Sequence, residues 1–167
     1  MRRKKSSVPY ILHPMEAAVI VGTMTDDSNL ISAAVLHDVV EDTDTTVEQI
    51  KKLFGERIAA LVASESENKR EDKPAESTWK IRKQETLDHL KNAPIDVKMI
   101  TLGDKLSNIR AIYRDYNTIG EELWQRFNQK DKNQHYWYYK SIAECLSTLK
   151  EYQAYKEYVD LVEKTFN

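Results

Sequence analysis

His37-Asp38-Val39-Val40-Glu41-Asp42-Thr43 follows directly on the mostly apolar run of residues 30–36. The stretch places one imidazole and three carboxyl groups within six consecutive residues. Ionisable groups at the end of a buried segment need a partner that neutralises them, and a divalent metal ion is the commonest such partner. This stretch therefore predicts a metal site at the end of a buried helix.

Two distant motifs supply further candidate ligands: His13 in PYILHP and Asp104 in GDKLSN. On one continuous helix the side chains of His37 and Asp38 would diverge by about 100°. Both can reach one ion only in a crevice between helices, where other segments complete the ligand set. Two imidazoles and two carboxylates, with water in the open positions, suit Mn²⁺ or a similar divalent ion. We predict one such ion, bound by His13, His37, Asp38 and Asp104.

Glu41 and Asp42 follow His37 and Asp38 by four residues each, so that one more helical turn would point both pairs the same way. A carboxylate beside a metal-bound water can orient that water or take its proton. We predict this catalytic role; the alternative is a pair of solvated acids before a turn. Asn108, four residues after Asp104, is placed to hydrogen-bond a hydroxyl or phosphate group.

Only four glycines and four prolines occur among 167 residues, and helix-forming residues are found throughout. We predict an all-α fold, a single helical bundle of about eight helices over residues 1–167. The first helix should begin near Pro14 and bury Met15, Ala18, Val19 and Val21. The other helices are expected over residues 30–36, from a capping box in Thr45-Thr46-Val47-Glu48 to residue 54, around 58–62, and over 77–91, 94–113, 132–151 and 153–166.

Two segments need separate interpretation. Residues 64–76 are mostly charged and show no apolar periodicity, so that we expect a mobile loop, either a lid or a solvated connection. The aromatic residues near the C-terminus, in His135-Tyr136-Trp137-Tyr138-Tyr139 and at Tyr152, Tyr155 and Tyr158, could stack on bases. The last three tyrosines recur at helical spacing, which favours core or helix packing.

The composition narrows the class of protein. With 25 basic and 27 acidic residues the net charge is −2, which gives no electrostatic reason to expect nucleic-acid or membrane binding. One cysteine, Cys145, excludes an internal disulfide and fits a reducing compartment. No apolar stretch approaches the roughly 18 residues of a membrane span, and no signal-peptide core follows the basic N-terminus. We expect a cytoplasmic protein; the sequence leaves a homo-oligomer open.

The candidate ligands and the motifs around them resemble those of a known enzyme family. His13, the His37-Asp38 pair and Asp104 resemble the HD-domain metal phosphohydrolases. The surrounding motifs PYILHP, AVLHDVVEDT, FGERI and GDKLSNIR resemble the hydrolase domain of the stringent-response Rel/Spo enzymes, from about residue 3 to residue 110. The resemblance implies a stand-alone small alarmone hydrolase. Such an enzyme uses Mn²⁺ to convert guanosine 3′,5′-bis(diphosphate) (ppGpp) or its pentaphosphate relative (pppGpp) to GDP or GTP and pyrophosphate.

The resemblance also implies residue roles. The four candidate ligands would bind the metal, Glu41 and Asp42 would position or activate the attacking water, and Asn108 would bind the nucleotide near its ribose. Basic residues before the PYILHP motif line the guanine and phosphate side of the family's pocket. Arg3, Lys4 and Lys5 occupy that region here.

Two departures from the family pattern bear on the substrate. The family has a helix ahead of these basic residues, which this sequence is expected to lack, and Ala111 replaces a frequent threonine. Two other functions therefore stay open: an HD-type hydrolase of another phosphorylated nucleotide, and a degenerate module that binds alarmone without hydrolysing it.

Overall fold

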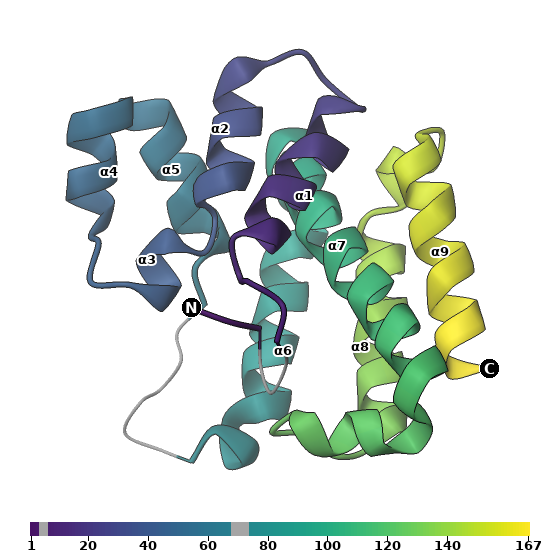
Figure 1. Cartoon of the computed structure of the whole chain (residues 1–167). Helices are drawn as coiled ribbons and strands as arrows, with labels where there is room; N and C mark the ends of the chain where they lie inside the picture. Colours follow the sequence, from purple (N-terminus) through teal and green to yellow (C-terminus); the bar gives the residue numbers. More distant parts are fainter. Residues whose placement is uncertain (4–6, 68–73) are drawn as a thin grey trace.

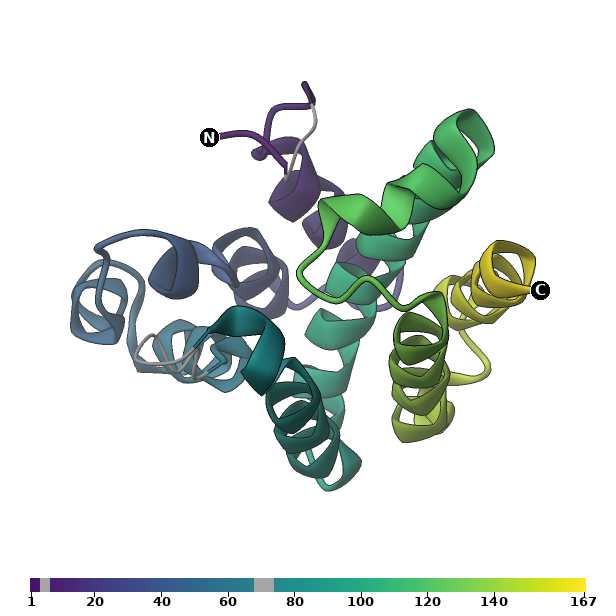
Figure 2. The same cartoon turned by 90° about the horizontal axis from the view of Figure 1, so that it is seen from below.

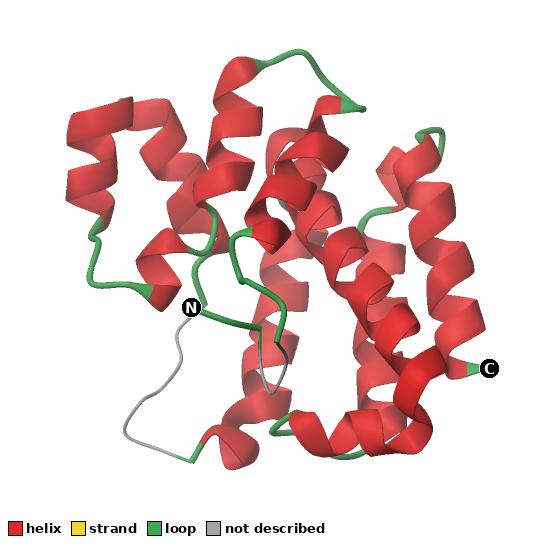
Figure 3. Ribbon diagram, viewed as in Figure 1, coloured by secondary structure: helices red, strands yellow, loops and turns green. Residues whose placement is uncertain are grey.

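The computed structural model describes residues 1–3, 7–67 and 74–167, and these residues form helices and no β-strand (Figures 1 and 3). The predicted all-α fold is confirmed. In chain order the α-helices are α1 (Leu12–Gly22), α2 (Ser28–Leu36), α3 (Val39–Asp42), α4 (Val47–Phe54), α5 (Glu56–Glu65), α6 (Ala75–Lys91), α7 (Ile95–Ile119), α8 (Lys132–Cys145) and α9 (Gln153–Phe166). Two 3₁₀ helices cover Gly120–Arg126 and Ser147–Leu149.

Helix α7 is the central element of the bundle. It contacts α1, α2 and α5 on one side and α9 on another, and Figure 2 shows it passing between the N-terminal helices and the pair α8 and α9. A helix with apolar residues around most of its circumference is a buried one. The buried apolar residues of α7 are Val97, Met99, Ile100, Leu102, Leu106, Ile109 and Ile112.

Gly103 is the point of closest approach between α7 and α1. A Cβ atom at this position would lie 2.8 Å from the carbonyl oxygen of Ala17 and 2.9 Å from Cγ2 of Val21. The absence of a side chain therefore lets the two backbones come together. Because Asp104 follows Gly103 and His13 lies on α1, this crossing sets the separation of two candidate ligands.

The helical conformation is interrupted between α2 and α3, at the His37-Asp38 pair. His37 follows the last residue of α2, and Asp38 precedes the first residue of α3. Because α2 ends before His37, the side chains of His37 and Asp38 do not have to diverge as they would on one continuous helix. The start of α2 is capped by Asp27, whose side chain accepts a hydrogen bond from the backbone N–H of Asn29 at 2.9 Å.

The predicted rotation of the first helix is only partly right: Ala18 and Val21 are buried as predicted, but Met15 and Val19 are not. The helix begins at Leu12, and Met15 and Val19 are 53% and 70% exposed. Its buried face consists of His13, Pro14, Ala17, Ala18, Ile20 and Val21. The inward position of His13 fixes this rotation, which apolar spacing alone did not reveal.

Several boundaries also differ from prediction. The capping box of α4 uses Thr46 and Gln49, one residue later than expected. Helix α7 continues to Ile119 and ends at Gly120, whose φ of +60° suits glycine. The predicted helix over 132–151 ends at Cys145 and is followed by a 3₁₀ turn.

The expected loop over residues 64–76 is shorter than predicted, because α5 includes Glu65 and α6 begins at Ala75. The interpretation of its centre, residues 68–73, as a lid or a connection lies outside the described residues, as do Lys4 and Lys5.

The C-terminal aromatic residues pack between α8 and α9, as predicted. Tyr158 is fully buried, and its hydroxyl donates to the backbone oxygen of Tyr139 at 2.8 Å. The hydroxyl of Tyr155 donates to the backbone oxygen of Ala143 at 2.9 Å. Among the described helices, none combines the length and the apolar character needed to cross a membrane.

The crossing at Gly103 can be tested by stability measurements. We expect Gly103→Ala to lower the free energy of unfolding by about 1 to 3 kcal/mol, because the new methyl group would overlap the backbone of α1. Gly22→Ala is the matched control, since its Cβ would meet only Cδ1 of Ile31 at 3.8 Å. This variant should be neutral or up to about 1 kcal/mol more stable. Equal stabilities of the two variants in urea would contradict the close approach.

Candidate functional site

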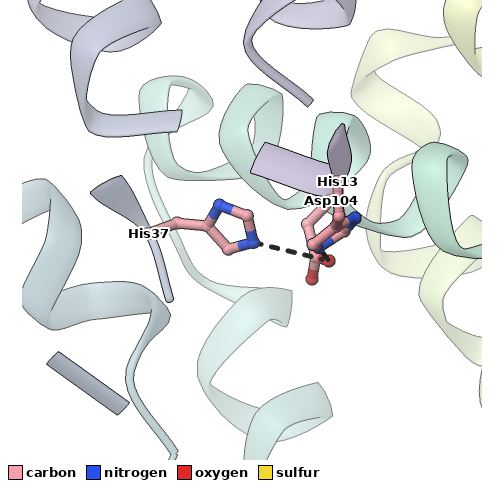
Figure 4. Close-up of side chains that lie close together, drawn as sticks. All are labelled: His13, His37 and Asp104. Atoms are coloured by element: carbon pink, nitrogen blue, oxygen red, sulfur yellow. Dashed lines mark ion pairs between the residues drawn. The ribbon is translucent and has the colours of Figure 1, made fainter. Parts of the chain in front are cut away.

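Three helical segments bring His13, His37 and Asp104 together (Figure 4). One potential ligand atom from each residue lies within 4.8 Å of those of the other two. Nε2 of His13 is 3.1 Å from Oδ1 of Asp104, and Nε2 of His37 is 3.7 Å from the same oxygen. All three residues are buried. The arrangement forms a compact pocket of nitrogen and oxygen donors, the ligand chemistry of a divalent metal centre.

Asp38 completes the cluster that the sequence predicts. Its Oδ2 lies 3.5 Å from Nε2 of His13 and 3.2 Å from Nε2 of His37. The hydroxyl of Tyr10 donates a hydrogen bond to the same oxygen. Burial, together with the charges of Asp38 and Asp42, raises the pKa of Tyr10, so that this hydroxyl keeps its proton. The structure thus gathers all four candidate ligands in one place.

The two ring nitrogens of His37 differ in their hydrogen bonding. Nδ1 lies 2.7 Å from the backbone oxygen of Ala34, which can only accept a hydrogen bond, so that Nδ1 carries a proton. In a neutral ring the other nitrogen then presents a lone pair. That atom, Nε2, is buried and has no hydrogen-bond partner among the described residues. A buried nitrogen in this state fits a metal ion, which would accept its lone pair.

The two carboxylates of the cluster are ionised. Burial would raise the pKa of Asp38, but the neighbouring imidazoles of His13 and His37 hold it well below its usual range. For Asp104 the opposing effects are the charge of Lys105, whose Nζ lies 2.7 Å from Oδ2, and the same two histidines. The carboxylates therefore attract positive charge into a buried space.

The histidines respond in the opposite direction. Burial would lower the pKa of His37, but the nearby carboxylates of Asp104 and Asp38 outweigh this effect and raise the pKa to about 11. The pKa of His13 is raised for the same reasons. Protons on the imidazoles or a bound cation can each balance the two carboxylates.

Glu41 and Asp42 lie beside this cluster. Both are on the single turn of α3 and line the cleft of about 850 Å³ that opens at the cluster. Oε2 of Glu41 accepts a hydrogen bond from the backbone N–H of Glu67 at 3.3 Å. Two carboxyl groups at the mouth of a metal-type cluster are placed to exchange protons with a group bound in the cleft.

Asn108 connects the cluster to the N-terminus. Its Nδ2 donates to Oδ1 of Asp104 at 2.6 Å, and its Oδ1 accepts from Nη2 of Arg3 at 2.6 Å. Arg3 and Asn108 therefore line the cleft together, as does Ala111. Lys4 and Lys5 lie outside the described residues.

A second charged group lines the cleft, and sequence reasoning missed it. The carboxylate of Glu67 is 2.7 Å from Nη1 of Arg82 and 3.0 Å from Nζ of Lys83, and it accepts a hydrogen bond from Thr86. Glu65 accepts a hydrogen bond from Thr101 at 2.9 Å, and burial together with the charge of Asp104 raises its pKa to about 7. Both glutamates fall within the 64–76 segment, where a run of charges gave no signal that two of them face inward.

The aromatic residues also contribute to the cleft. Trp79 and His135 are buried side by side, with ring centroids 5.5 Å apart, and Tyr138 and Tyr139 are buried as well. All four line the cleft. The prediction of core packing is confirmed for His135, Tyr138 and Tyr139, but the same side chains form part of the cleft wall.

The chain is similar to known proteins over most of its length. The HD domain family matches residues 1–132. A Danio rerio protein named guanosine-3′,5′-bis(diphosphate) 3′-pyrophosphohydrolase MESH1 is 38% identical over 119 residues, which cover 70% of this chain and 60% of that protein. An Aquifex aeolicus protein with the same enzyme name is 35% identical over 115 residues, which cover 67% of this chain but only 16% of that protein.

Solved structures agree with these matches. A crystal structure from Listeria monocytogenes EGD-e superposes with a TM-score of 0.81 at 28% identity and covers 95% of this chain and 96% of its own. A structure described as a metazoan ortholog of SpoT that hydrolyses ppGpp gives a TM-score of 0.74 at 26% identity. That match covers 97% of this chain and 84% of the other.

The protonation of the histidines predicts that metal binding depends on pH. A ligating imidazole must be neutral, whereas a pKa of about 11 keeps a free His37 protonated at neutral pH. Binding of a divalent ion should therefore displace protons. We expect its affinity to rise about tenfold per pH unit for each proton displaced between about pH 6 and about pH 8. Calorimetry in two buffers of different ionisation enthalpy counts the protons; buffer-independent heats with a pH-independent affinity would contradict the expectation.

Proposed function

The chain belongs to the HD domain family, and from this premise we propose that it is a metal-dependent hydrolase of ppGpp and pppGpp. The products would be GDP or GTP and pyrophosphate, and residues 1–167 would form one HD-type hydrolase domain. One observation carries the proposal: His13, Asp38 and Asp104 converge on buried His37, whose Nε2 forms no hydrogen bond with the described residues. The names of the relatives support the choice of substrate.

We assign the metal to these four residues and propose Mn²⁺ as the ion. The donor set supports a divalent ion of intermediate hardness, because it combines two imidazoles with two carboxylates and contains no thiolate. The ionised state of Asp38 and Asp104 supports it further. When bound, the ion would supply a coordinated water of lowered pKa and would polarise a phosphoryl oxygen.

Glu41 and Asp42 would carry the proton transfers. A carboxylate beside the cluster orients the attacking water and takes its proton as the water adds to the phosphorus that is joined to the ribose 3′-oxygen. The bond between that phosphorus and the 3′-oxygen breaks, and the 3′-oxygen receives a proton. Pyrophosphate then leaves as one unit. The hydrogen bond from the backbone of Glu67 to Glu41 fixes one carboxylate for this task.

Arg3 and Asn108 would bind the nucleotide. The guanidinium of Arg3 supplies positive charge at the edge of the cleft, and Asn108 holds it beside Asp104. An amide and a guanidinium in this position suit the hydroxyl and phosphate oxygens of a ribose phosphate. From the sequence, we also propose that Lys4 and Lys5 bind the nucleotide.

A second candidate substrate is another phosphorylated nucleotide. It is favoured by Ala111, which lines the cleft and offers no hydroxyl group to the ligand. Turnover of a panel of nucleotides under the same conditions distinguishes the two candidates.

Product analysis tests the proposed function. Purified protein with Mn²⁺ should convert ppGpp to GDP and intact pyrophosphate in one step, and chelation of the metal should stop the reaction. Asp104→Asn should lose both metal and activity, because it removes a ligand charge from the buried cluster. Early release of orthophosphate, or cleavage at the 5′ end, would overturn the proposal in favour of a different nucleotide phosphohydrolase.

The roles of Glu41 and Asp42 can be separated from metal binding. Glu41→Gln and Asp42→Asn should keep the metal content while kcat falls by roughly 10²-fold or more, as expected for the loss of a positioned acid or base. His37→Ala, measured in parallel, should lose both the metal and the activity. Metal content and kcat are determined on the same samples. Joint loss of both in Glu41→Gln would make Glu41 a ligand, and unchanged kcat in both variants would return the pair to solvated acids.

A further inference from the structure

A chain of hydrogen bonds leads from His13 to the C-terminal helix. Nδ1 of His13 lies 2.9 Å from Oγ of Ser107, which donates to Oε2 of Glu16 at 2.7 Å. Oε1 of Glu16 accepts from Nη1 of Arg110 at 3.0 Å. Arg110 in turn donates from Nε and Nη2 to the two oxygens of Glu157 at 2.6 and 2.8 Å. We call Ser107, Glu16, Arg110 and Glu157 the His13 relay.

The direction of each hydrogen bond in the relay is determined by the groups involved. An ionised carboxylate can only accept, so that the hydroxyl hydrogen of Ser107 points to Glu16. The oxygen of Ser107 is then left as an acceptor for His13, and Nδ1 of His13 must carry the proton. When the imidazole is neutral, its lone pair is therefore on Nε2. That atom faces Asp38 and Asp104, where the proposed metal would lie.

Burial makes the inner part of the relay difficult to replace. Ser107 is 0% exposed and His13 is 3% exposed, so that solvent does not reach the bond between them. If the hydroxyl were absent, Nδ1 would lose the acceptor that selects its tautomer. A ligating histidine generally has its other ring nitrogen held in this way, and loss of that partner typically weakens metal binding about 10- to 100-fold.

The outer part of the relay comes from a different region of the chain. Arg110 lies between a carboxylate on α1 and one on α9, and its bond to Glu157 is bidentate, which fixes the plane of the guanidinium. Helix α9 begins at Gln153, beyond the residues 1–132 that match the HD domain family. In Figure 1, α9 runs beside α7, which carries both Arg110 and Ser107.

We infer that the His13 relay is a positioning device through which α9 holds His13 in the tautomer and orientation that bind the metal. The inference rests on the proposed function, because it assumes that His13 is a metal ligand. It assigns Ser107, Glu16, Arg110 and Glu157 as positioning residues, which act on the metal through His13.

The test uses Mn²⁺ alone, with no nucleotide, and measures its dissociation constant by calorimetry. Ser107→Ala should weaken Mn²⁺ binding about 10- to 100-fold. Glu157→Gln should cause a smaller loss of several-fold, because it loosens Arg110 at the outer end of the relay. The matched control is Asp160→Asn, also on α9, whose carboxylate is exposed and forms an ion pair with Lys164 at 2.7 Å. This control should bind Mn²⁺ like the wild type.

A double variant separates positioning from a general loss of packing. Once the Ser107 hydroxyl is gone, the outer residues no longer reach His13, so that Ser107→Ala combined with Glu157→Gln should bind Mn²⁺ no more weakly than Ser107→Ala alone. Two independent structural defects would instead multiply their effects. Thermal melting in EDTA accompanies each measurement. If Ser107→Ala does not fold, Glu157→Gln against Asp160→Asn still decides the role of α9.

The outcomes distinguish the inference from the proposed function. Wild-type Mn²⁺ affinity in Ser107→Ala, or equal affinities of Glu157→Gln and Asp160→Asn, would overturn the relay while ppGpp hydrolysis by the wild type stands. Multiplied effects in the double variant would also overturn it. A wild-type protein that binds no divalent ion would overturn both.

Discussion

The close crossing of α1 and α7 at Gly103 is the constraint on which the site depends. Two helix backbones can approach this closely only where one residue lacks a side chain, and the next residue, Asp104, then meets His13 at 3.1 Å. Because α7 also contacts α2, the same central helix fixes the position of His37. Tight apolar packing therefore determines the geometry of a polar cluster, which hydrogen bonds and charges then refine.

Electrostatics explains why this cluster is open to a cation. Half-buried Asp38 and buried Asp104 stay ionised because two imidazoles and Lys105 balance them. The balance is a competition, since a proton and a metal ion would occupy the same lone pair of His37. The backbone oxygen of Ala34 holds the other nitrogen of this ring, so that its free nitrogen faces inward. The fold thus orients Nε2 of His37 toward the cluster, and the pH and the metal concentration determine whether a proton or a metal ion occupies it.

The sequence was sufficient where one local stretch carried the information. The His37-Asp38 pair after an apolar run, and polar residues four apart at Asp104 and Asn108, are short-range signals that the structure brings together as expected. The rotation of α1 was not predictable in the same way, because apolar spacing favoured Met15 and Val19 over the face that carries His13. Contacts between distant positions were invisible: His13 and Ser107 are 94 residues apart, and Arg110 and Glu157 are 47 apart. Glu67 was missed because it lies beyond the end of α5 and its partners lie on α6.

The candidate ligands and the candidate catalysts are supported in different ways. His13, His37 and Asp104 are buried residues on or next to helices of the core, whose packing restricts their movement. Glu41 and Asp42 lie on a single helical turn that has no buried residue. A short element of this kind contributes little rigidity of its own. The position of Glu41 therefore depends on the backbone of Glu67, which Arg82 and Lys83 hold from α6. In this arrangement Arg82 and Lys83 act through Glu67 to position the carboxylate to which we assign proton transfer.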